Sequence, residues 1–79
     1  MTIRDLIHRE NETSLGFSLN DHLEEMAALK DYITESNSSK EFYEMHKNMV
    51  KGMIQALLCV HTITDTEFLE IMEDIKRNY

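Results

Sequence analysis

The residues with metal-binding or catalytic potential are four histidines and one cysteine, in a chain of 79 residues with 15 acidic side chains. Asp5–His8 and His22–Glu25 each place a carboxylate and an imidazole three residues apart, which on a helix is one face. A di-metal site in a helical bundle needs two Glu-x-x-His pairs and two further inward carboxylates. The two pairs here run in opposite orders, and Glu25 falls on an acidic outer face. We therefore predict no metal site and no cofactor.

The sequence also lacks a supported arrangement for nucleophilic catalysis. Cys59 and His61 are two residues apart, so on a helix their side chains point in different directions. Cys59 lies beside the apolar residues Leu58 and Val60, and we expect a buried, unreactive thiol. There is no glycine-rich phosphate-binding loop. We therefore predict a protein that is not an enzyme, with no catalytic residue and no small-molecule substrate.

Hydrophobic periodicity predicts the elements that carry these side chains. Apolar residues recur at steps of three and four through residues 40–61, which predicts the central helix of a small bundle. Further helices are predicted over residues 2–10, 18–35 and 66–77. Short turns make the last three helices antiparallel neighbours. The expected fold is all-α, a single domain over residues 1–79 with three main helices and a short, loosely held first helix.

Capping residues mark the predicted helix starts. Thr64 with Glu67, and Thr2 with Asp5, have the three-residue spacing of a capping box. Glutamate is the usual partner in such a box, so the pair at Thr64 is the clearer one. The second helix is assigned a start at Ser18, with Asn20 as the alternative cap, after a polar loop over residues 11–16. The third helix is assigned a start at Ser38 or Ser39.

The charge balance limits the kinds of partner that this protein is expected to bind. The net charge is −7, from 15 acidic and 8 basic residues, whereas non-specific binding to nucleic acid or anionic membrane needs clustered Lys and Arg. No segment approaches the roughly 20 apolar residues of a transmembrane helix. The first ten residues carry charges in place of a signal peptide's apolar run. One cysteine also suits a reducing compartment. We therefore expect a cytoplasmic protein with no direct nucleic-acid or membrane partner.

Without a catalytic signature, the leading interpretation is a small acidic regulator or inhibitor that acts by binding another protein. Such chains are common among antirepressors and inhibitors encoded by phages and mobile elements, an analogy of size and composition alone. Two alternatives are a structural subunit for oligomerisation or assembly, and an acidic nucleic-acid mimic that blocks a DNA-binding protein. The predicted interaction residues are acids on the second and last helices: Glu24, Glu25, Asp31, Glu70, Glu73 and Asp74.

The central helix is expected to take part in an interface. Its apolar surface is too broad for two short neighbouring helices to cover, and methionine-rich faces adapt to partner proteins; an ordinary core filled with methionine is the alternative. Gly52 within it either admits a close neighbouring helix or is a tolerated defect. We predict a homodimer, or a stable heteromeric partner, through this helix. The predicted dimer seam consists of Met45, Met49, Met53 and Ala56.

Overall fold

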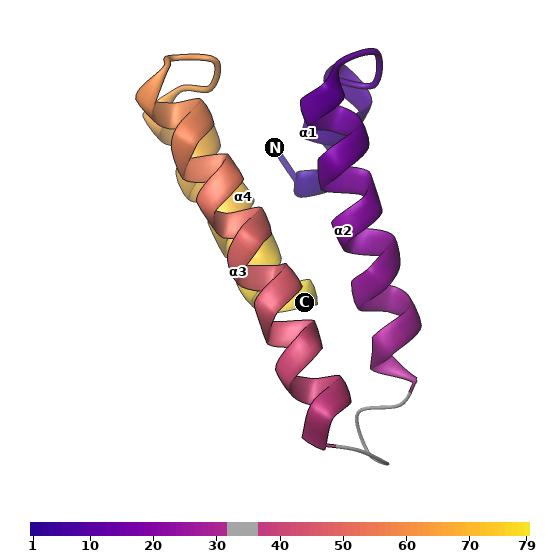
Figure 1. Cartoon of the computed structure of the whole chain (residues 1–79). Helices are drawn as coiled ribbons and strands as arrows, with labels where there is room; N and C mark the ends of the chain where they lie inside the picture. Colours follow the sequence, from indigo (N-terminus) through magenta and orange to yellow (C-terminus); the bar gives the residue numbers. More distant parts are fainter. Residues whose placement is uncertain (32–36) are drawn as a thin grey trace.

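The computed structural model describes the chain except for residues 32–36 and the side chain of Asn37. The described residues form four α-helices and no strand, which confirms the all-α prediction. The helices are α1 (Ile3–Arg9), α2 (Ser14–Lys30), α3 (Asn37–Cys59) and α4 (Asp65–Asn78). In Figure 1, α2 runs along one side of α3, α4 lies behind α3, and α1 sits beside the first turns of α2. No helix in the described part of the chain is long and apolar enough to cross a membrane.

Both predicted capping boxes are present. The Thr2 hydroxyl accepts a hydrogen bond from the Asp5 N–H at 3.1 Å, and the Asp5 carboxylate accepts one from the Thr2 N–H at 2.9 Å. Thr64 and Glu67 make the same exchange at 3.1 and 2.9 Å. Each box satisfies N–H groups that have no partner inside their helix. These local signals therefore place the starts of α1 and α4 correctly.

The other two predicted helix starts are wrong. The second helix begins four residues before Ser18, because Thr13 caps it by accepting a hydrogen bond from the Gly16 N–H at 3.0 Å. The predicted loop over residues 11–16 is correspondingly shorter. The third helix begins at Asn37, so Ser38 and Ser39 lie inside it. The predicted end of the second helix near Glu35 lies outside the described residues, and α2 ends at Lys30.

Gly16 allows α2 to start directly against the end of α1. It is buried, and a Cβ atom built on it would collide with the backbone carbonyl of Glu10. Only glycine lets two backbones approach this closely. The sharp reversal between α1 and α2 therefore depends on the missing side chain at this position.

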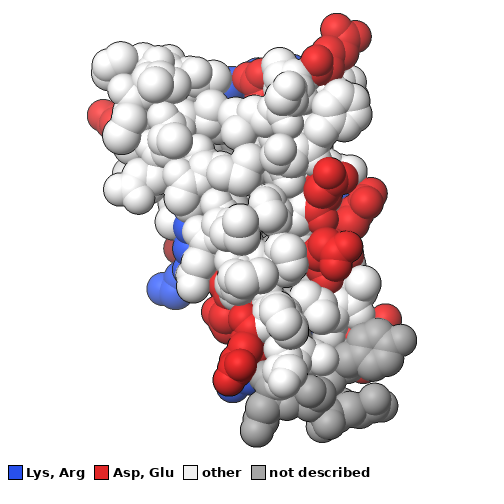
Figure 2. Space-filling model, in the orientation of Figure 1, with Lys and Arg blue, Asp and Glu red and all other residues white. Residues whose placement is uncertain are grey.

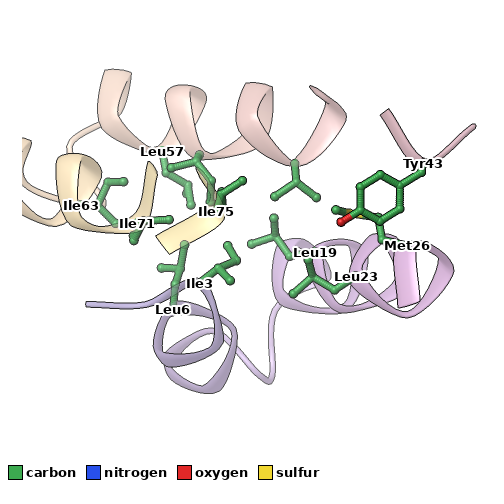
Figure 3. Close-up of a cluster of buried hydrophobic side chains, with 12 residues drawn as sticks. Ile3, Leu6, Leu19, Leu23, Met26, Tyr43, Leu57, Ile63, Ile71 and Ile75 are labelled. Carbon is green, nitrogen blue, oxygen red and sulfur yellow. The ribbon is translucent and has the colours of Figure 1, made fainter. Parts of the chain in front are cut away.

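The core lies between α2 and the α3–α4 pair, and α1 closes one end of it (Figure 3). Ile3 and Leu6 of α1 are both 0% exposed, so the expectation of a loosely held first helix is wrong. Its apolar side chains are as fully buried as those of the longer helices. The twelve core residues are Ile3, Leu6, Leu19, Leu23, Met26, Tyr43, Val50, Ile54, Leu57, Ile63, Ile71 and Ile75.

The turn from α3 to α4 reverses the chain in five residues. The Thr62 N–H bonds the carbonyl of Leu57 at 3.0 Å, and the His61 N–H bonds that of Leu58 at 3.1 Å. This pair of bonds is a Schellman motif, which requires a left-handed residue after the helix. His61 takes that conformation, with φ of 61°. The tight reversal sets α4 antiparallel against α3, as predicted.

Candidate protein-interaction surface

One face of α3 belongs to the core. Its core residues are Tyr43, Val50, Ile54 and Leu57, and α3 contacts both α2 and α4. The Tyr43 hydroxyl donates a hydrogen bond to the main-chain oxygen of Tyr79 at 2.9 Å, and burial raises the pKa of this hydroxyl above its ordinary value. This half of α3 is therefore occupied by the chain's own helices.

The other face of α3 carries an exposed row of uncharged residues. They follow one another at alternating steps of three and four, the spacing at which helices pair in coiled coils. Phe42, Met45 and Met49 are 54%, 44% and 48% exposed, and the other three members are also exposed. We call this row the α3 seam: Phe42, Met45, Met49, Gly52, Ala56 and Cys59.

The α3 seam has a large half and a small half. Its first three members have bulky side chains, whereas its last three are glycine, alanine and cysteine. A Cβ atom added at Gly52 would meet nothing within 4 Å. No described part of this chain therefore approaches Gly52 closely, and the space beside it is free for an added side chain.

The six members of the α3 seam are uncharged, but acidic side chains border its large half. Around Met45 and Met49 the surface forms a shallow open depression along this one helix, and Lys40, Glu41 and Glu44 also line it. Asn48 and Gln55 lie next to the seam, while Lys47 and Lys51 lie on other sides of the helix. Figure 2 shows a broad uncharged area over α2 and α3, with acidic side chains along the α2 edge and beside the lower turns of α3.

The structure separates the members of the predicted dimer seam. Met45, Met49 and Ala56 lie in the α3 seam, but Met53 is half-buried against the core of its own chain. Phe42 and Gly52 were not among the residues predicted for the dimer seam. The alternating spacing of three and four residues in the sequence identifies both.

The expectation of a buried Cys59 is wrong, because this residue is exposed. Cys59 follows the buried residue Val50 by nine positions, which is two and a half turns of helix. Its side chain therefore points away from the core, into the α3 seam.

The predicted acidic residues are divided between two helices whose Cα atoms all lie more than 8 Å apart in the described chain. Glu24, Glu25 and Asp31 are exposed on α2. On α4, Glu70 lies 3.2 Å from the amino group of Met1, and the other two acids also have partners in the chain. The structure therefore does not bring the six acids together into one surface.

A histidine pair joins α2 to α3. Nδ1 of His22 lies 2.9 Å from Nδ1 of His46, and the ring centroids are 5.2 Å apart. Both rings are half-buried. No group of three or more His, Cys, Asp or Glu residues that could hold a metal ion occurs in the described ranges.

The fold and this surface define a small all-α protein with an uncovered, uncharged helix face. No protein-family model, curated protein or solved structure matches the chain.

Proposed function

We propose that this protein is a small non-catalytic regulator or inhibitor that acts by binding another polypeptide through the α3 seam. The observation that carries the proposal is the exposure of three large apolar side chains, Phe42, Met45 and Met49, in one row on one helix. Exposed apolar surface of this kind marks protein–protein contact sites. Methionine suits such a site, because its flexible side chain fits partners of different shape.

The neutral α3 seam favours a polypeptide over a nucleic acid as its partner. A phosphate backbone is bound through clustered Lys and Arg, and the α3 seam contains neither. An acidic nucleic-acid mimic is less favoured, because the acids are divided between α2 and α4, whose Cα atoms all lie more than 8 Å apart in the described residues.

A structural assembly subunit is the second candidate function. The alternating spacing of the α3 seam supports it, because that pattern is typical of helices that pair along their length. A regulator and an assembly subunit would use the same surface, so they differ in the consequence of binding. A regulator changes an activity of its partner at a fixed molar ratio, whereas an assembly subunit changes only the partner's mass.

Site-specific photocrosslinking in the native cells tests the proposal. A benzophenone amino acid replaces Phe42 in the α3 seam and, in a matched control, replaces Leu69 on α4, which is 67% exposed. We expect covalent polypeptide adducts from position 42 and far fewer from position 69. Equal yields from both positions, or no adduct at position 42, would contradict the proposal.

The regulatory part of the proposal needs an activity measurement. The polypeptide captured at position 42 is identified by mass spectrometry, purified, and titrated with the unmodified protein. A regulator or inhibitor changes the activity until a fixed stoichiometric ratio is reached. An unchanged activity at saturation would leave the assembly function as the better description.

A further inference from the structure

We infer that the α3 seam pairs with the α3 seam of a second copy of this chain, with the two helices antiparallel. This inference rests on the proposed function, since it takes the α3 seam as a polypeptide-binding surface and names its partner. It is carried by the order of side-chain sizes along the seam.

The antiparallel register follows from the positions in the seam. With the two-fold axis between Met49 and Gly52, Met49 of each copy faces Gly52 of the other. The same register places Met45 opposite Ala56 of the second copy, and Phe42 opposite Cys59 of the second copy. Every bulky member of the seam therefore meets a small one.

Size complementarity of this kind produces a closely packed interface. Helices pair when side chains of one enter the spaces between side chains of the other, and small residues allow axes to approach to about 8 Å. A parallel pair would set Phe42 on Phe42 and Gly52 on Gly52, which crowds one end and leaves a void at the other. Protein interiors tolerate neither overpacking nor voids.

Charge is compatible with a second copy in this register. The chain carries a net charge of −7, and Glu41 and Glu44 lie beside Met45 and Met49. The antiparallel register sets these two acids opposite residues 60 and 57 of the second copy, whereas a parallel pair would set them against the same acids of the second copy. In the antiparallel register Asn48 lies near Gln55 of the second copy, and their amide side chains can both donate and accept hydrogen bonds.

The size of the seam predicts a weak dimer. Residues 42–59 extend over about 26 Å of helix. Pairing would bury on the order of 1,000 Å² in total, the lower end of the range for specific interfaces. Dissociation is therefore expected near micromolar concentration, on the order of 1–100 µM.

Sedimentation equilibrium of the purified chain from micromolar to millimolar concentration is the first test. We expect the mass to rise from 9.3 kDa towards twice that value. Gly52→Leu should abolish the rise, because leucine would collide with Met49 of the second copy. The variant folds, since the space beside Gly52 is open, and circular dichroism verifies this. A wild-type mass of one chain at millimolar concentration would overturn the inference.

A compensating substitution tests the register. In the double variant Met49→Ala/Gly52→Leu, the added leucine faces a shortened side chain at position 49 of the second copy, so dimerisation should return. A parallel pair gives the opposite result, because leucine would then face leucine and Gly52→Leu alone would tighten the dimer. A tighter dimer from the single variant would overturn the antiparallel inference.

A disulfide test reports the same geometry independently. Phe42→Cys should form a covalent dimer with the native Cys59 of the second copy under mild oxidation, because a disulfide needs Cα atoms within about 7 Å. The wild-type chain should form no covalent dimer, since the Cys59 residues of the two copies lie at opposite ends of the antiparallel pair. Rapid wild-type crosslinking would indicate a parallel pair.

These outcomes separate the inference from the proposed function. If position 42 captures a different protein and the purified chain stays monomeric, the partner is not a second copy of this chain. The proposed function would then stand without the inference. If position 42 captures nothing, the proposed function fails, and the mass of the purified chain alone decides whether the second copy is the partner.

Discussion

The Asp74 carboxylate accepts a hydrogen bond from the backbone N–H of Ile3 at 2.9 Å, across 71 positions of sequence. Ile3 is the first residue of α1, where the N–H has no partner within the helix. The same carboxylate also accepts a hydrogen bond from the Asn78 amide at 2.7 Å. Asp74 therefore caps α1 from α4 and ties the first helix to the last.

Replacing this carboxylate should loosen α1. Asp74→Ala is expected to lower the free energy of unfolding by about 1–2 kcal/mol, because the partly buried N–H of Ile3 loses its acceptor. Urea denaturation followed by circular dichroism measures the change.

Glu73→Ala is the matched control for Asp74→Ala. Glu73 is an exposed neighbour on the same helix and pairs with Arg77 at 2.9 Å. Such surface pairs contribute at most about 0.5 kcal/mol. Equal losses from the two variants would contradict the capping role of Asp74.

The two glycines should respond in opposite directions to alanine. Gly16→Ala forces a Cβ atom against the Glu10 carbonyl and should lower stability by about 1–3 kcal/mol. Gly52→Ala adds its Cβ in open space within a helix and should raise stability by about 1 kcal/mol. Thermal unfolding at low micromolar concentration compares both with the wild type. A neutral result for Gly16→Ala would mean that α1 and α2 can separate at little cost.

The capping carboxylates should make the fold sensitive to acid. The backbone hydrogen bond from Thr64 lowers the pKa of Glu67, and Arg9 adds to the effect; the backbone hydrogen bond from Thr2 lowers the pKa of Asp5. A carboxyl whose pKa is lower in the folded state adds stability above its ordinary pKa of about 4. That stability is lost as the pH falls through the lower, folded-state values.

Urea titrations at pH 7 and pH 3 measure this loss of stability. Glu67→Gln should reduce the difference between the two pH values, because glutamine does not titrate. An undiminished difference in Glu67→Gln would assign the acid sensitivity to other carboxyls.

The histidine pair should strengthen the α2–α3 contact. A hydrogen bond between His22 Nδ1 and His46 Nδ1 at 2.9 Å requires one N–H and one free lone pair. His22→Ala removes this bond from a part-buried position and should lower the free energy of unfolding by about 1 kcal/mol.

His22→Gln is the matched variant for the histidine pair. The glutamine side chain can still exchange a hydrogen bond with His46, so the loss of stability should be smaller than in His22→Ala. Urea denaturation of both variants and the wild type gives the comparison. Equal losses from the two variants would show that the hydrogen bond to His46 adds nothing to stability.

The sequence by itself determines the all-α fold and the starts of α1 and α4. Helical periodicity and capping boxes act between residues three or four apart, so the relevant partners are close in the sequence. The pairing of Thr64 with Glu67 is of this kind. The same rules also fit more than one position: Thr13 caps α2 through the Gly16 N–H three residues on, and local spacing alone does not rank Thr13 above Ser18.

Only the tertiary structure decides how the helices use their apolar faces. The chain places apolar residues around much of α3, and which of them become core depends on where α2 and α4 dock. Docking buries Val50 and leaves Met49 and Cys59 exposed, since adjacent positions on a helix point about 100° apart. The anchoring of α1 by Asp74 is equally a product of docking, because it joins residues at opposite ends of the chain.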